Sequence, residues 1–169
     1  MKKFLFAAGS VLFSLALMCG CGKDDPDARD NYVGDFTGTR HTTSTINNSF
    51  VENDNTCTLR VRKNEGNSKS IVVYPTTTKD LLFYTEDMKF VKIDGADAYC
   101  GAIKGGTIDN EDGSKIVTEA VNISEKIPYS CAIIPDKDGK YILMYSYKTI
   151  TTTTYNTEVI YTDSFTGTK

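Results

Sequence analysis

The chain has 169 residues, of which 24% are charged, and its formal net charge at pH 7 is −3. Without the first twenty residues, which hold Lys2 and Lys3 but no acid, 17 of the 19 basic side chains remain against 22 acidic ones, a formal charge of −5. So acidic a chain is a poor partner for nucleic acid, because that binding requires Lys and Arg to neutralise phosphates. The roughly 140 residues beyond the N-terminal segment suffice for one domain with its own core.

The first residues have the order of a secretory signal peptide. Lys2 and Lys3 precede an apolar run from Phe4 to Met18, and small residues and cysteines follow. The run is shorter than the ~20 residues that a membrane-spanning helix needs. We therefore predict a signal peptide over residues 1–20 and no transmembrane anchor.

The signal ends in Gly20 and Cys21, which resembles the lipobox of bacterial lipoproteins. In that motif a small residue precedes a cysteine that is lipidated and becomes the mature N-terminus. Met18 and Cys19 depart from the usual residues of the motif, and the alternative is a signal peptide cleaved nearby. The resemblance implies that Cys21 carries several acyl chains, which together give stable anchoring to a membrane.

An acidic tether follows the lipobox. Lys23, Asp24 and Asp25 resemble the lysine-plus-acidic export signal of Bacteroidetes surface lipoproteins, which implies the outer face of the outer membrane. The alternative is a hydrated spacer, because Pro and acidic residues favour extended chain. We assign residues 21–30 to the lipidated cysteine and tether, and residues 31–169 to one domain.

Beyond the tether, side chains alternate with a period of two and no window shows a helical stripe, which predicts an antiparallel all-β domain. The clearest run is Thr56–Arg62, in which Cys57, Leu59 and Val61 share one face. The other predicted strands are Tyr32–Thr39, Ser70–Tyr74, Phe83–Ile93, Ala98–Ile103, Lys115–Ile123, Ile127–Ile133, Leu143–Tyr147 and Thr154–Phe165.

Turn residues separate these runs. The predicted turns are Asn64–Asn67, Asp94–Gly95, Gly105–Gly106, Asn110–Gly113 and Asp136–Gly139. The last of them shares residue types with a calcium loop, but the remaining EF-hand ligands are absent, so we interpret it as a turn. One short helical turn is predicted over Lys79–Tyr84.

Two nearly equal strings, Phe36–Arg40 and Phe165–Lys169, predict that the first and last strands lie side by side and close a barrel. Chance similarity in a Thr-rich chain is the alternative. With the Tyr32–Phe36 opening, the pattern resembles the lipocalin-like, or calycin-like, barrels of small Bacteroidetes lipoproteins, although Phe36 stands where lipocalins carry Trp. The resemblance implies an up-and-down meander of about eight or nine strands, whose interior holds either packed side chains or one small apolar ligand.

The sequence shows no convincing catalytic or metal-binding constellation. Cys57, Cys100 and Cys131 lie on predicted strands, which favours buried free thiols, although any one pair could form a disulfide. His41 is the one imidazole, and no cysteine spacing is typical of zinc. Glu119 fits an edge or partnered carboxylate better than a catalytic one. We expect no enzyme activity, no metal and no cofactor.

The C-terminal third is rich in Thr and Tyr. The run Thr149–Thr157 predicts either a solvent-facing β edge or an adhesive surface. Overall we expect a non-enzymatic, lipid-anchored outer-membrane protein at the cell surface that carries a small apolar ligand in its barrel. The alternative is a module with a filled barrel that binds a protein or glycan through exposed strands and loops.

Overall fold

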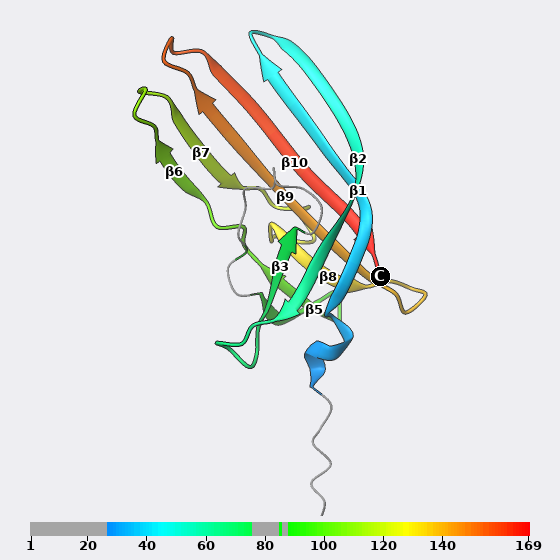
Figure 1. The fold of residues 1–169 in the computed structure, drawn as a ribbon. Coiled ribbons are helices and arrows are strands. Elements are labelled where there is room, and N and C mark those ends of the chain that lie inside the picture. The colour runs from blue at the N-terminus through cyan, green and yellow to red at the C-terminus, as the bar shows by residue number, and fades with distance from the viewer. Residues whose placement is uncertain (1–26, 76–84, 86–87) are drawn as a thin grey trace, which may run out of the picture.

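The computed structural model describes residues 27–75, 85 and 88–169 (Figure 1). The predicted signal peptide, Cys21, Lys23, Asp24 and Asp25 lie outside the described residues, as does the whole of the helical turn expected over Lys79–Tyr84. The described part contains one short 3-10 turn and ten strands. None of its helices is long and apolar enough to cross a membrane.

The elements follow one another from an N-terminal turn to a C-terminal strand. They are η1 (Ala28–Asn31), β1 (Gly34–Ile46), β2 (Ser49–Lys63), β3 (Ile71–Pro75), β4 (Lys89–Ile93), β5 (Ala96–Gly101), β6 (Gly106–Asp109), β7 (Lys115–Ala120), β8 (Cys131–Pro135), β9 (Tyr141–Thr152) and β10 (Glu158–Thr168). All strand pairings are antiparallel. The expected all-β class is therefore confirmed.

Eight strands form a path that nearly closes into a barrel, in the order β3-β2-β1-β10-β9-β8-β5-β4. The path runs up and down in chain order, with the β6–β7 hairpin inserted between β5 and β8. Its two ends meet at a single bridge, where the Met88 amide donates to the Ile71 carbonyl at 3.3 Å. No ladder joins β3 to β4 in the described chain, so one seam of the barrel is left unsealed.

The first and last strands close the sheet as the repeated strings predict. Gly38 lies opposite Gly167, and Thr37 and Thr39 lie opposite Thr168 and Thr166. A Cβ added at Gly38 would overlap the Thr166 carbonyl and the Gly167 backbone. Glycine is therefore required here because the two backbones approach too closely for any side chain.

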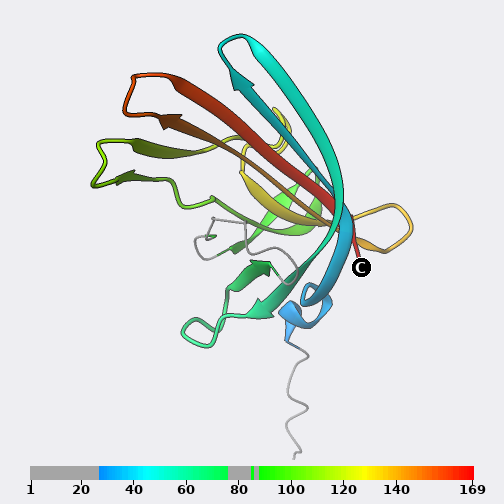
Figure 2. The ribbon, with the colours of Figure 1, turned by 45° about the horizontal axis from the view of Figure 1, so that its top comes forward.

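The long strand β9 divides the molecule into two parts. Its first half, Tyr141–Tyr145, pairs with β8, and its second half, from Tyr147 to Thr152, pairs with β7. The lower part is the barrel, and above it an upper sheet of β2, β1, β10, β9, β7 and β6 continues (Figures 1 and 2). The tips of its three hairpins lie at one end of the molecule, and η1 lies at the other (Figure 1).

Side chains fill the lower barrel. Phe36, Leu59, Ile133 and Leu143 are all fully buried, and Tyr145 stacks on Phe165 with ring centroids 5.7 Å apart. A second, smaller cluster lies outside the barrel, where loop residues cover Ala98, Cys100 and Ala132 on β5 and β8. The packed interior that the sequence left as one of two alternatives is therefore the one found in this part of the barrel.

Two sequence predictions need correction. The strand expected over Ile127–Ile133 begins only at Cys131, because residues 124–127 form a turn and Pro128 has no amide hydrogen to donate to a ladder. Ile127 therefore packs on the outer cluster and not in the barrel. The predicted β edge at Thr149–Thr157 is also wrong, since β9 is paired on both sides up to Thr152 and the remaining residues form the turn to β10.

Most predicted turns are confirmed, and one was missed. Asp94 and Gly95 have φ of 48° and 83°, as a two-residue hairpin turn requires. The turns at residues 64–67, 110–113 and 136–139 are also present, whereas Gly106 belongs to β6. The missed turn is Asn47–Asn48, with φ of 46° and 66°.

Gly38→Ala is expected to push β1 away from β10 and to lower the free energy of unfolding by about 1–3 kcal/mol. Urea unfolding of residues 22–169, which contain every described strand, measures this change. Gly106→Ala is the matched control, because nothing lies within 4 Å of the added Cβ. Equal midpoints for the two variants would contradict the close approach of the two backbones.

Candidate functional site

A buried cluster of polar side chains lies where the barrel meets the upper sheet. Asp163 on β10 is 1% exposed and accepts hydrogen bonds from Arg40 Nε at 2.9 Å and from Arg40 Nη2 at 2.5 Å. The hydroxyls of Tyr145 and Tyr147 each donate to it at 2.8 Å. Arg40 Nη2 also donates to the Tyr161 hydroxyl at 3.2 Å. We call these five residues the Asp163 cluster.

Strand register brings the cluster together. Asp163 lies opposite Tyr147 on β9, and its neighbour Phe165 lies opposite both Arg40 on β1 and Tyr145 on β9. Because alternate residues of a strand share a face, all members of the cluster point inward with Phe165. One carboxylate thus connects the three strands that close the sheet.

The cluster is electrically paired inside the protein. Burial alone would lower the pKa of Arg40, but its hydrogen bonds and ion pair with Asp163 outweigh that effect and hold the pKa above its ordinary value. Burial, together with the charge of Asp163, raises the pKa of Tyr145 and Tyr147 far above the usual range. The guanidinium therefore stays charged, and both hydroxyls stay protonated donors.

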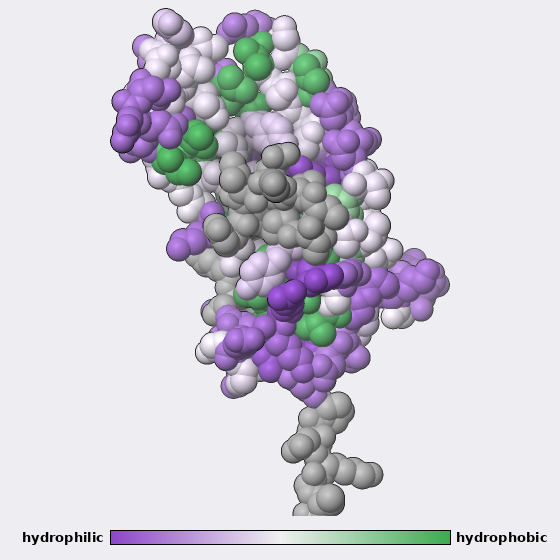
Figure 3. All heavy atoms as spheres, in the orientation of Figure 1, coloured by the Kyte–Doolittle hydropathy of each residue, from purple (hydrophilic) through white to green (hydrophobic). Residues whose placement is uncertain are grey.

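Two rows of inward-facing side chains lie above Asp163, as register shows, and the first of them includes Tyr161 of the cluster. We call the first the hydroxyl row: Ser44, Tyr161, Thr149 and Thr118 carry hydroxyls, and Val51 and Gly106 lie at its two ends. We call the second the tip row: it is mainly apolar, with Ile46, Val159, Ile116 and Ile108, and it also contains Thr151 and Ser49. Ile46 and Ile108 are 44% and 58% exposed, so the tip row is open to solvent. Figure 3 shows hydrophobic groups gathered at this end of the inner face.

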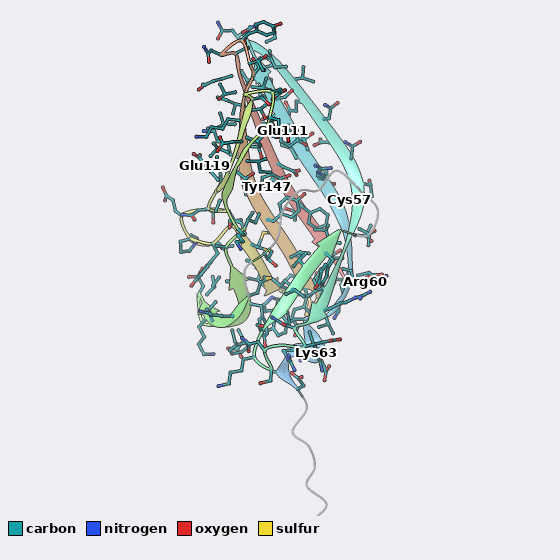
Figure 4. All side chains as sticks on the ribbon, turned by 60° about the vertical axis from the view of Figure 1, so that its left-hand side comes forward. Cys57, Arg60, Lys63, Glu111, Glu119 and Tyr147 are labelled. Atoms are coloured by element: carbon teal, nitrogen blue, oxygen red, sulfur yellow. The ribbon has the colours of Figure 1, made fainter. Side chains whose placement is uncertain are left out.

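Figure 4 shows how side chains divide between the two faces of the sheet. Tyr147 and Cys57 point into the space that the sheet encloses, whereas Arg60 and Glu119 point away from it. Arg60 forms an exposed ion pair with Asp35 at 2.6 Å on the outer face. The inner face is thus chemically distinct from the outer one.

The opposite end of the barrel is closed by aromatic rings. Tyr32, which follows η1, packs against Tyr99 and Tyr141 with centroids 4.7 and 4.8 Å away, and burial raises its pKa to about 12. The ammonium of Lys169 donates to the carbonyls of Asn31 and Val33 and lies 5.8 Å from the centre of the Tyr141 ring. Access to the inner face from this end is therefore blocked.

The three cysteines of the domain are buried and free, as the sequence favoured. Burial raises the pKa of Cys100 to about 11 and also raises the pKa of Cys57 and Cys131. Since the thiolate is the reactive form, these thiols are poor nucleophiles. The partner expected for Glu119 is Lys148, which lies 3.8 Å away, and Asp136 accepts two backbone hydrogen bonds within its turn.

His41 lies on the outer face, away from the Asp163 cluster. Its Nδ1 is 2.7 Å from Asp54 Oδ1 and its Nε2 is 3.4 Å from Glu52 Oε1. Hydrogen bonding to Asp54 raises the pKa of His41 above its ordinary value. Among the described residues, no group of three or more His, Cys, Asp and Glu side chains could hold a metal ion.

Comparison with protein-family models, curated proteins and solved structures gives no match to this chain. The site is therefore interpreted from its own residues. Sequence reasoning missed Arg40 and Asp163, which are 123 positions apart. A signal was present, because Arg40 is in phase with Phe36 and Gly38, and a charged residue at an inward position requires a partner.

Asp163→Asn is expected to leave the guanidinium of Arg40 buried without its counter-charge and to cost about 3–5 kcal/mol of stability. Changing the connected side chains together, Arg40→Met and Asp163→Leu with Tyr145→Phe and Tyr147→Phe, removes the buried charges and the two hydroxyls that donate to Asp163, and should restore much of the loss. Urea unfolding of the three proteins measures both effects. A single variant as stable as the unchanged protein would mean that the ion pair does not hold the strands together.

The pKa of His41 is expected to lie above the ordinary value of 6.5, and Asp54→Asn should return it toward that value. The contribution of the His41–Asp54 pair to stability is therefore fully present below the pKa of His41 in the unfolded chain, and it is lost as the pH rises through the pKa of His41 in the folded protein. An NMR titration measures the pKa of His41 directly, because the chain contains one histidine. A value at or below 6.5 would show that Asp54 does not bind the imidazolium in solution.

Proposed function

We propose that this protein is a non-enzymatic, lipid-anchored protein of the cell envelope that binds a small ligand on the inner face of its upper sheet. The observation that carries the proposal is the contrast between the two parts of the molecule. Below the Asp163 cluster, side chains fill the barrel and Tyr32 closes its end. Above it, the inner face continues as two rows of uncharged, partly exposed side chains.

The filled barrel changes where a ligand would bind. The resemblance to lipocalin-like barrels suggests the barrel interior, but Phe36, Leu59 and Phe165 occupy that volume. The upper inner face offers both apolar and hydrogen-bonding groups, which is typical of sites for small molecules. We therefore place the ligand above the Asp163 cluster.

The position of the tether fits this proposal. Arg29 in η1 donates to the carbonyls of Asn67 and Ser70 at 3.2 and 3.4 Å, which fixes the start of the domain to the turn after β2. This end lies opposite the three hairpin tips (Figure 1). A lipid on Cys21 would hold the closed end toward the membrane, and the open inner face would point away from it.

A second candidate is an interaction module that binds a protein or glycan through an exposed strand. One observation favours it: among the described strands, β2 pairs only with β1 over residues 49–57, so its outer edge carries no second described strand there. Phe50 is 61% exposed on this stretch. Unpaired edges of this kind accept an added strand from a partner.

Native mass spectrometry of residues 22–169, purified from cell extract, distinguishes the two functions. A stoichiometric small-molecule adduct that is released on denaturation is the result expected for a carrier. Ile116→Ser in the tip row should lower its occupancy, whereas Val117→Ser, on the outer face of the same strand, should not. A bare mass for the unchanged protein would contradict the carrier and favour the interaction module.

Cys21→Ala is expected to release the protein from membranes, because the acyl chains have no other attachment point in the proposal. Fractionation of cells that express the variant measures this. Replacing Lys23, Asp24 and Asp25 by Ala should leave the protein on membranes but abolish labelling of intact cells. A Cys21→Ala protein that still sediments with membranes would refute the lipid anchor.

A further inference from the structure

Among the residues that the structure describes, none on the upper inner face above the Asp163 cluster is charged. Both rows are neutral, including Val51 in the hydroxyl row and Ser49 and Thr151 in the tip row. The outer face of the same strands carries all the charges, which are His41, Glu52, Asp54, Asp109, Lys115, Glu119, Lys148 and Glu158. Exposure to solvent does not explain why only the outer face is charged, because much of the upper inner face is exposed to solvent as well.

Along the upper inner face, apolar side chains lie nearest the open end and polar side chains lie deepest. A barrel with an apolar pocket has the reverse order. The apolar tip row lies at the open end, the hydroxyl row lies below it, and the Asp163 cluster lies deepest. Successive rows on one face of a strand are about 7 Å apart. A molecule that spans both rows would therefore contact hydroxyl groups at its inner end and mainly apolar groups at its outer end, near the hairpin tips.

We infer that the upper inner face binds a neutral amphiphile with its hydroxylated head inward, against the hydroxyl row, and its apolar tail along the tip row. This inference rests on the proposed function and names its class of ligand. The serine and threonine hydroxyls of the row both donate and accept hydrogen bonds, as the hydroxyl groups of such a head do.

A charged head does not fit this face. Arg40 and Asp163 satisfy each other's charges, and both tyrosines below the hydroxyl row already donate to Asp163. An ion placed on the hydroxyl row would lose hydration without gaining a counter-charge. The tip row, in contrast, gains from covering an alkyl chain, because Ile46 and Ile108 lose exposed apolar surface.

Three probes test the inference on residues 22–169: octyl glucoside, octanoate and glucose, with the two amphiphiles kept below their micellar concentrations. The first has a neutral hydroxylated head and an eight-carbon tail, the second has a charged head, and the third has no tail. NMR titration should show octyl glucoside binding at least tenfold more tightly than either of the others. The shifted amide signals should belong to the hydroxyl row and the tip row.

Paired variants separate the two rows. Thr149→Val should weaken binding of octyl glucoside severalfold, and Thr152→Val, on the outer face of the same strand, should leave it unchanged. Ile116→Ser should weaken it about tenfold, with Val117→Ser as its control. Ile108→Ser, on strand β6, gives the same test at a position where the side chain is 58% exposed.

The outcomes distinguish this inference from the proposed function. If octanoate binds as tightly as octyl glucoside, the inference of a neutral head is overturned, although the face still binds a ligand. A ligand released from the cell-purified protein that proves to be ionic would have the same meaning. Shifts confined to the outer face, or no binding of octyl glucoside at all, would also overturn it. A stoichiometric adduct in native mass spectrometry would still support the carrier function in that case.

Discussion

The carboxylate of Asp163 is the interaction on which the architecture depends. It binds Arg40 on the first strand and two tyrosine hydroxyls on β9, and it does so from the last strand of the chain. An unpaired charge at this depth would be costly, so the register of all three strands must satisfy it at once. Immediately below, Gly38 and Gly167 let the same strands approach closely, and apolar packing takes over.

The level of the Asp163 cluster divides the molecule chemically as well as geometrically. Below it, the barrel is packed and its far end is closed by Tyr32 and Lys169. Above it, the sheet has lost β3, β4, β5 and β8 as partners, so its inner face opens. The proposed functional face therefore exists because the hairpin strands are longer than the barrel requires.

Local patterns in the sequence predicted the barrel but not its upper extension. The strand around Leu59 followed from alternation, and the adjacency of the first and last strands followed from the repeated strings. The prediction stopped β1 at Thr39 because the inward positions beyond it, Arg40, Thr42 and Ser44, are polar and break the apolar pattern. Asp163 stabilises that continuation from 123 residues away, which no local window can detect.

A rigid barrel, closed over Asp163, supports an open upper sheet. Amide hydrogen exchange on residues 22–169 can measure this difference in rigidity. We expect the slowest exchange in Thr37–Thr42 of β1 and the facing part of β10, and much faster exchange in the same strands beyond Ser44. Uniform protection along β1, or faster exchange at Arg40 than near Ile46, would contradict it.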